Sequence, residues 1–252
     1  MDAWPPGVGR EILAETDSTN AEALRRAAAG DFGPVWILAG RQTAARGRRG
    51  RPWAMAAGNF AATLLDRPPG ALALRSFVAA LGLFDTMVAV SGRPEIFALK
   101  WPNDVLLAGG KLAGILLESG PAGALALGVG VNLAEAPDPS TLEPGAVTPV
   151  GLREATGIAV TPEELLDILA PAVAHWEARL RAEGFAPLRA AWLSRAKGLG
   201  EEVTARLPGR SHVGRFESVD ETGALVLATD AGRLVLPAAE VHFAGALDAA
   251  RH

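Results

Sequence analysis

Short apolar runs separated by glycine, proline and polar residues fill the first half of the chain. Runs of this length bounded by turn residues are typical of strands. The pattern predicts strands at residues 9–15, 35–40, 59–65, 96–107 (two runs joined by a turn), 111–118 and 124–133. Because tight turns at Gly109-Gly110 and Gly120–Gly123 join the last of these, we expect a mostly antiparallel meander rather than a βαβ array.

Helices are predicted where apolar residues repeat with helical spacing. The predicted helices cover about 20–29, 72–90, a stretch from Thr161 toward Gly184, and 187–196. Thr161-Pro162-Glu163-Glu164 combines an N-cap residue, a proline at the first helical position and acidic residues in the first turn. Pro171 predicts a kink or a break in that helix. Residues 134–150 are rich in proline and are expected to form a loop.

After Gly198 the pattern changes to short alternating strands separated by turns. The predicted strands are EEVTARL, VGRFESV, ALVLAT and RLVLPAAEV. We therefore expect an α+β fold with two domains. Residues 1–198 would form a mixed, mostly antiparallel sheet with flanking helices, and residues 199–252 would form a small β-barrel.

The composition of the chain excludes several classes of protein function. The 252 residues include no cysteine, which excludes disulfides, thiolate nucleophiles and cysteine-ligated metals. No apolar run approaches the ~20 residues of a membrane-spanning helix, and the N-terminus lacks the features of a signal peptide. We therefore expect a cytoplasmic protein with no membrane partner. The net charge of −4 argues against a nucleic-acid-binding protein whose whole surface is basic.

Three residue types are rare, and their positions attract interest because arginine and alanine dominate elsewhere. They are lysine (Lys100, Lys111, Lys197), glutamine (Gln42) and asparagine (Asn20, Asn59, Asn103, Asn132). The four histidines share no ligand spacing, and Ser18 lacks the Gly-x-Ser-x-Gly context of a serine hydrolase.

Residues 41–53, RQTAARGRRGRPW, carry five arginines and no acidic residue. Two glycines and a proline predict a loop. The arginines favour a clamp for phosphate or carboxylate groups, and a solvated basic loop or a small nucleic-acid contact is the alternative. The glycine pattern matches neither a P-loop nor a Rossmann fingerprint.

Three further segments could carry chemistry, and each has a plain structural alternative. Lys100-Trp101-Pro102-Asn103-Asp104 could bind phosphate or metal-bound water, or could be a simple turn. Lys111 could stabilise a developing oxyanion, or could reach water from a strand end. The glycines of Gly128-Val129-Gly130-Val131-Asn132 could mark close approach of a ligand, or could serve packing.

Taken together, these segments resemble the catalytic core of the biotin protein ligases. The matching stretches are Asp17–Asn20, Gln42-Thr43 with Arg46–Trp53, Lys100–Asp104, Lys111–Leu116 and Gly128–Leu133. Each is modest alone, but their order and spacing make a specific signal. The resemblance implies a class II aminoacyl-tRNA synthetase-like core followed by a small SH3-like domain. In that family biotin and ATP form biotinyl-5′-adenylate, and a lysine of a biotin carboxyl carrier protein then attacks the adenylate.

The resemblance also implies site residues. Those implied for biotin are Ser18, Thr19, Asn20, Gln42, Arg46, Gly47, Arg48, Lys111 and Gly114. Those implied for ATP, with Mg²⁺, are Arg48, Arg51, Trp53, Lys100, Asn103, Asp104 and Asn132. Lys111 and Arg48 are the implied catalytic residues, and the Mg²⁺ ligands are not specified. The polar groups of Ser18, Thr19, Asn20 and Gln42 suit the neutral ureido ring of biotin, and the arginine loop would fold over the ligand.

One departure concerns Ala45, which stands where this family typically has glycine. If the position requires a positive φ, alanine costs roughly 1 kcal/mol. The core begins by about residue 9, so we expect a ligase-only type that binds no specific DNA, and a homodimer is left open. The expected partner is the carrier protein of acetyl-CoA carboxylase or a related carboxylase. A lipoate or octanoate ligase on the same fold, or a nucleic-acid-binding module, is the competing interpretation.

Overall fold

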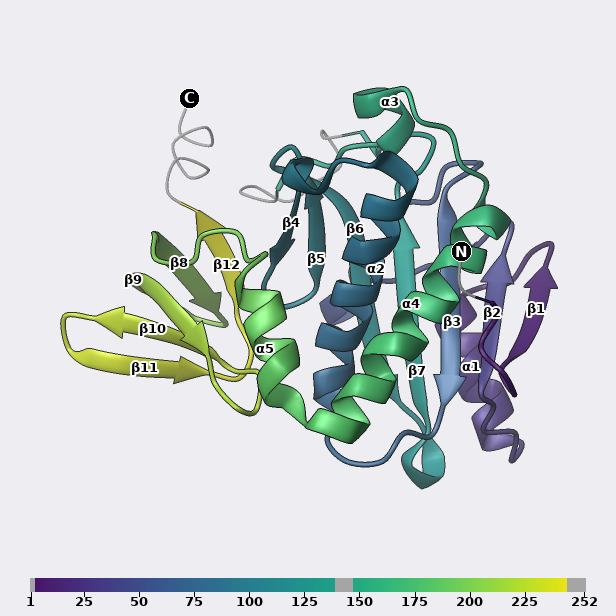
Figure 1. Ribbon diagram of the computed structural model, residues 1–252, viewed down its shortest axis with the longest axis horizontal. Coiled ribbons are helices and arrows are strands. Elements are labelled where there is room, and N and C mark those ends of the chain that lie inside the picture. Colours follow the sequence, from purple (N-terminus) through teal and green to yellow (C-terminus); the bar gives the residue numbers. More distant parts are fainter. Residues whose placement is uncertain (1–2, 139–146, 244–252) are drawn as a thin grey trace.

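The computed structural model describes residues 3–138 and 147–243, and it contains two β-sheets (Figure 1). The larger sheet has seven strands in the order β1-β2-β3-β7-β6-β5-β4. Its strands are β1 (Gly9–Leu13), β2 (Val35–Ala39), β3 (Phe60–Asp66), β4 (Phe97–Lys100), β5 (Asp104–Leu107), β6 (Gly110–Ser119) and β7 (Leu125–Val131). Only the β1–β2 pair is parallel among the described strands of this sheet, so the predicted antiparallel meander is confirmed for β4 to β7.

Helices cover both faces of the large sheet. Helices α2 (Arg75–Ser91) and α4 (Pro162–Glu183) lie side by side on one face (Figure 1). Helix α1 (Thr19–Ala28) packs on the other face, against β3 and β7. Alternate residues of the strands therefore enter two separate cores. The expectation that no apolar run approaches membrane-spanning length is wrong for Leu72–Ser91, which is apolar and long enough to cross a membrane. Most of this segment is buried, as is typical of the core helix of a globular protein.

Helix α4 begins as the sequence predicts, with a capping box between Thr161 and Glu164. Of the predicted kink or break at Pro171, the break is wrong, because α4 continues through Pro171 to Glu183. Proline inside a helix costs about 3 kcal/mol. Apolar contacts with α2 on both sides of Pro171 offset this cost. Gly82 of α2 lets the backbone of Val173 approach so closely that a Cβ at Gly82 would lie 3.0 Å from its nitrogen.

Two short helices complete the α-helical part of the described chain. They are α3 (Leu152–Thr156), which the sequence pattern did not predict, and α5 (Phe185–Leu193), which begins earlier than expected. Part of the predicted proline-rich loop, residues 139–146, lies outside the described residues.

The second sheet is antiparallel, with the order β11-β10-β9-β8-β12. Its strands are β8 (Glu202–Leu207), β9 (Arg210–Val219), β10 (Leu225–Thr229), β11 (Gly232–Leu236) and β12 (Glu240–Phe243). The segment RLVLPAAEV, predicted as one strand, is two strands on opposite edges of this sheet. Pro237 separates them because it has no N–H for a strand ladder. This arrangement carries β12 back beside β8 and toward the large sheet.

Candidate active site

A cavity of about 550 Å³ lies on the face of the large sheet that carries α1. Strand β7 shows why the cavity forms there, since its odd-numbered residues enter the core under α2 and α4 while Gly128 and Gly130 face the cavity. The lining includes every residue implied for biotin or ATP: Ser18, Thr19, Asn20, Gln42, Arg46, Gly47, Arg48, Arg51, Trp53, Lys100, Asn103, Asp104, Lys111, Gly114 and Asn132. Their ligand roles stay predictions.

One end of the cavity is a polar wall formed by Ser18, Thr19, Asn20 and Gln42. Ser18 is the N-cap of α1, so the following residues start the helix at the cavity. Thr19 N donates to Gln42 Oε1 over 2.8 Å, which fixes the glutamine side chain. Gln42 Nε2 contacts Met55 Sδ, a weak acceptor, at 3.8 Å. The amide N–H groups of Gln42 therefore keep hydrogen-bonding capacity for a ligand.

Asn20 differs from the rest of the polar wall because the protein itself engages its amide. Nδ2 donates to Glu118 Oε2 at 2.8 Å, and Oδ1 accepts from the hydroxyl of Thr63 at 2.6 Å. Thr63 Oγ1 also lies 2.8 Å from Thr19 Oγ1. Sequence reasoning missed Thr63 and Glu118. Thr63 could have been noticed as a polar residue inside the apolar strand 59–65. Glu118 could have been noticed as an acidic residue at the end of the apolar strand 111–118.

The basic loop, residues 45–53, closes through its own backbone. Trp53 N donates to Ala45 O at 2.9 Å, and Gly47 N donates to Arg51 O at 2.7 Å. The positive φ values of the loop lie at Arg49 (59°) and Gly50 (72°). Ala45 lies outside that region, so the backbone cost considered for alanine at this position does not arise in this conformation.

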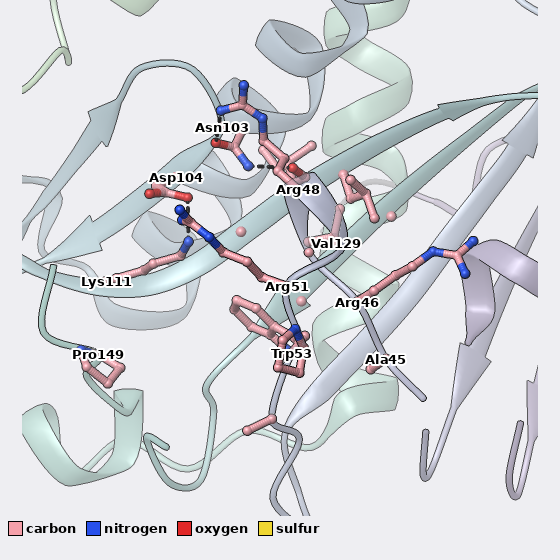
Figure 2. A pocket seen from close by; sticks show the side chains of 18 of the residues that line it. Ala45, Arg46, Arg48, Arg51, Trp53, Asn103, Asp104, Lys111, Val129 and Pro149 are labelled. Atoms are coloured by element: carbon pink, nitrogen blue, oxygen red, sulfur yellow. Dashed lines mark hydrogen bonds and ion pairs between the residues drawn. The ribbon is translucent and has the colours of Figure 1, made fainter. Parts of the chain in front are cut away.

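The arginines of the basic loop contact acceptors on several elements. Arg46 pairs with Glu118 at 3.0 Å, Arg48 Nη1 lies 3.4 Å from Asn103 Oδ1, and Arg51 pairs with Glu240 at 2.6 Å. Figure 2 shows Arg51 directed toward the Asp104 end of the cavity and Arg46 directed the other way. Burial lowers the pKa of Arg48 from its usual value, although nearby Asp104 opposes the shift.

Asp104 lies between two lysines at the other end of the cavity. Its Oδ1 is 2.8 Å from Lys111 Nζ, and its Oδ2 is 3.6 Å from Lys100 Nζ. Burial raises the pKa of Asp104, but the charges of Lys111 and Lys100 outweigh it and hold the pKa below its usual value. Burial lowers the pKa of Lys100, and Asp104 only partly opposes that shift. The three groups thus form a cluster in which two lysine side chains flank one buried carboxylate.

The glycines of β6 and β7 make room for site side chains. A Cβ at Gly128 would lie 2.2 Å from Asn20 Oδ1, and one at Gly130 would lie 2.8 Å from the Trp53 ring. Gly114, opposite Gly130 in the sheet, lies under the same ring. Lys111 Nζ is 5.7 Å from the centre of that ring. The indole therefore forms one side of the space beside Lys111.

Asn132 lines the cavity, and its side chain holds a buried acceptor. Its Nδ2 donates to the carbonyls of Lys111 and Val150 at 3.4 and 3.3 Å, while Oδ1 has no hydrogen-bond partner among the described residues. An unpaired buried acceptor is costly, and a donor on a ligand would reach this oxygen only after neighbouring atoms move. The C-terminal sheet adds lining residues that sequence reasoning missed: Arg206, Glu240, Val241 and His242.

The cavity offers little to a resident metal ion. Within residues 3–138 and 147–243, no group of three or more His, Cys, Asp or Glu side chains could hold one. The carboxylate nearest the lysines, that of Asp104, is already flanked by two ammonium groups. A divalent ion at Asp104 would meet strong repulsion, so the residues present do not fit a protein-only Mg²⁺ site.

Comparison with known proteins agrees with this geometry. Residues 15–133 match the Biotin/lipoate A/B protein ligase family, and residues 198–243 match the Biotin protein ligase C terminal domain. The chain is 56% identical over 241 residues to the biotin–[acetyl-CoA-carboxylase] ligase of Paracoccus denitrificans, covering 93% of this chain and 100% of that one. It is 35% identical to the ligase of the same name from Mycobacterium tuberculosis, covering 92% and 87%.

A solved structure shares the whole arrangement. The biotin protein ligase from Aquifex aeolicus, in complex with biotin and ATP, superposes with a TM-score of 0.80 at 25% identity, covering 92% of this chain and 97% of that one. The match spans both sheets, so the cavity between the basic loop and the C-terminal sheet belongs to a shared architecture. The chain belongs to the biotin protein ligases of the biotin/lipoate A/B protein ligase family.

Proposed function

We propose that the protein activates biotin with ATP and transfers it to a lysine of the carrier protein of acetyl-CoA carboxylase. Relatives from Paracoccus denitrificans and Mycobacterium tuberculosis are biotin–[acetyl-CoA-carboxylase] ligases, and the Aquifex aeolicus enzyme binds biotin and ATP. The observation that carries the proposal is one cavity with two chemically different ends. Neutral hydrogen-bonding groups form the polar wall, and cations gather around Lys111.

The two ends follow the strands beneath them. The Leu116/Gly128 pair of β6 and β7 lies under Asn20, and the Gly114/Gly130 pair lies under Trp53. These pairs are two residues apart, which is about 7 Å along a strand. A ligand with a neutral polar head, a short apolar chain and an anionic end would fit along this direction. Biotin has that form.

At the polar wall, the ureido ring of biotin would meet Ser18, Thr19 and Gln42. The Gln42 amide N–H groups and the Ser18 hydroxyl can donate to the ureido oxygen, and the hydroxyl oxygens can accept from the ring N–H groups. Asn20 would act by holding the wall, because Thr63 and Glu118 engage its amide. A ligand without these polar groups would leave the wall unpaired, which discriminates against it.

At the cationic end, a biotin carboxylate oxygen would attack the α-phosphorus of ATP, and the bond to the β-phosphate would break to release pyrophosphate. Both reactants are anionic, so Lys111 and Arg48 would ease their approach and stabilise charge on the phosphoryl oxygens. Lys100 and Arg51 would bind phosphates, and Asn132 would help to position ATP. Mg²⁺ would arrive bound to the phosphates of ATP, as part of the substrate.

In the second step, the neutral ε-amine of the acceptor lysine attacks the acyl carbon of the adenylate. The acyl–oxygen bond breaks, AMP leaves, and the amine loses a proton as the amide forms. The basic loop supports this sequence by covering the adenylate and excluding water until the acceptor arrives.

Two alternatives are less well supported. A lipoate or octanoate ligase belongs to the same family, but those ligands have no ureido ring for the polar wall. A nucleic-acid-binding function would use the cations of the basic loop, but Arg46 and Arg51, although partly exposed, already pair with Glu118 and Glu240. Arg48 faces Asn103.

One assay separates these functions: pyrophosphate release from ATP with biotin, with lipoate, and with neither. We expect release only with biotin, and labelled biotin on a carrier domain only when its acceptor lysine is present. Equal release with lipoate would refute the proposed specificity. A specific DNA complex that survives excess competitor, without pyrophosphate release, would favour the nucleic-acid alternative.

A further inference from the structure

Glu118, near the end of β6, lies where the polar wall and the basic loop meet. We propose that Glu118 is a positioning residue that holds the loop closed against the wall and thereby retains the adenylate. The proposal rests on the proposed function, because it assigns a residue to the retention of that intermediate. Neither the sequence motifs nor the family resemblance singled out this side chain.

Each oxygen of the carboxylate has its own partner. Oε2 accepts from Asn20 Nδ2 at 2.8 Å, and Oε1 accepts from Arg46 Nη2 at 3.0 Å and Nε at 3.3 Å. Asn20 belongs to helix α1, and Arg46 belongs to the basic loop. One side chain on a sheet strand therefore ties together two elements, and both are far from it in the sequence.

The Asn20 side chain has little freedom to rearrange. Both acceptors of its Nδ2, the Glu118 carboxylate and the Leu116 carbonyl, can only accept, which fixes the amide orientation. Its Oδ1 lies so close over Gly128 that a Cβ there would be 2.2 Å away. The hydroxyl of Thr63 joins this oxygen to Thr19. The position of Glu118 is thus transmitted to a wall residue proposed to touch biotin.

The ion pair between Glu118 and Arg46 is weak enough for the basic loop to open and close reversibly. The side chain of Arg46 is 41% exposed and that of Glu118 is 25% exposed, so the pair is a partly solvated one and contributes modestly. A modest contact suits a loop that must open for each substrate. Arg51 and Glu240 hold the loop near its other end. Loss of Glu118 should therefore loosen only the end next to the polar wall.

Two substitutions separate the roles of the two oxygens. Glu118→Gln keeps an acceptor for Asn20 but removes the charge that pairs with Arg46. We expect labelled biotinyl-adenylate to leave the isolated complex about 2- to 5-fold faster, with the KM for biotin within about twofold of normal. Glu118→Ala also removes the acceptor for Asn20. We expect it to show the same faster release together with a KM for biotin raised roughly tenfold.

A double-mutant cycle tests whether Arg46 is the partner. Arg46→Ala and Glu118→Gln should each speed release, and the double variant should release adenylate no faster than Arg46→Ala alone. Glu22→Gln is the matched control, since Glu22 is an acid of α1 whose side chain pairs with Arg25 and Arg26. We expect its adenylate retention to be normal.

Failure of this inference is distinguishable from failure of the proposed function. If the unsubstituted protein releases no pyrophosphate with biotin and ATP, the function itself is wrong. If it does, and Glu118→Gln retains adenylate as long as the unsubstituted protein, Glu118 does not hold the loop. Full additivity in the double variant would also overturn the proposal. An unchanged melting temperature of Glu118→Gln, checked in parallel, would show that faster release is not a consequence of unfolding.

Discussion

Arg51 Nη1 of the basic loop and Glu240 Oε1 of strand β12 lie 2.6 Å apart. Glu240 also lies 3.5 Å from Arg49 Nη1 of the same loop. Burial raises the pKa of Glu240, but its hydrogen bond with Arg51 and the charges of both arginines outweigh this and lower the pKa. The carboxylate is therefore charged at neutral pH. Through this residue the C-terminal sheet acts on the cavity, because it fixes the loop that covers it.

We expect Glu240→Gln to loosen the loop in the protein without ligand. A partly exposed ion pair contributes about 0.5–1 kcal/mol, so hydrogen exchange in residues 47–53 should be roughly two- to fivefold faster. Glu217→Gln is the control, because Glu217 pairs with Arg233 on the same sheet. Unchanged exchange in Glu240→Gln would mean that the pair does not hold the loop.

A second prediction concerns backbone conformation in the basic loop. Gly50 has a φ of 72°, and a Cβ at this position would meet no atom within 4 Å. Gly50→Ala therefore adds backbone strain without a clash, at a cost of about 1 kcal/mol to the closed loop. Adenylate release should become about fivefold faster.

The control for Gly50→Ala is Gly92→Ala at the end of α2. Gly92 has a φ of 69°, and a Cβ there would meet no atom within 4 Å. An alanine at this position would therefore have the same backbone strain as one at Gly50, but away from the site. We expect a similar loss of global stability with normal adenylate retention. If both variants release adenylate equally fast, the faster release in Gly50→Ala comes from lower stability of the whole protein and not from the loop.

Much of the large sheet could be predicted because most of its strands, though not β1, are largely apolar runs bounded by turn residues. The β6–β7 meander follows from the short turns alone. The continuity of α4 through Pro171 could not be predicted, because it depends on packing against Gly82 from a distant segment. The segment RLVLPAAEV forms two strands because its two halves pair with different strands, β11 with β10 and β12 with β8. These pairings could not be read from the segment itself.

The rarity of lysine and asparagine points to several residues that line the cavity, but not every rare residue lies there. Lys111 and Asn132 line the cavity. Asn59 instead binds the backbone of residues 134 and 135, and Lys197 lies over the ring of Phe243. Thr63 and Glu118 could not be found from composition, because their importance comes from contacts with α1 and the basic loop across the sheet.

The pKa of Lys100 leads to a prediction for the pH dependence of adenylation. Burial lowers this pKa below that of an ordinary lysine, so rising pH removes the charge of Lys100 earlier than it would in water. Loss of this cation would weaken phosphate binding, so the alkaline fall of kcat/KM for ATP should begin below the usual lysine range. Lys100→Arg keeps its charge and should shift that fall to higher pH. Lys197→Arg, at the lysine outside the cavity, should leave the profile unchanged, and an unshifted profile in Lys100→Arg would contradict the assignment.

Lys111 gives the most direct test of the cationic end. Lys111→Ala removes the ammonium proposed to lie between the biotin carboxylate and the α-phosphate, so adenylation should fall by roughly 10²–10³-fold. The structure adds a stability cost of about 1–3 kcal/mol, because buried Asp104 would keep only Lys100, at 3.6 Å. Unfolding in denaturant, measured for Lys111→Ala and for the Lys111→Ala/Asp104→Asn double variant, separates the two effects.

We expect the double variant to recover much of the lost stability, because it no longer buries an underpaired carboxylate, and to remain inactive in adenylation. Lys111→Arg should restore adenylation only in part, since a planar guanidinium does not reproduce a compact point charge. Transfer of biotin from added biotinyl-adenylate to the carrier lysine should suffer less than adenylate synthesis, because the attack on phosphorus has already taken place. Near-normal adenylate synthesis by folded Lys111→Ala would show that another cation of the cluster performs this role.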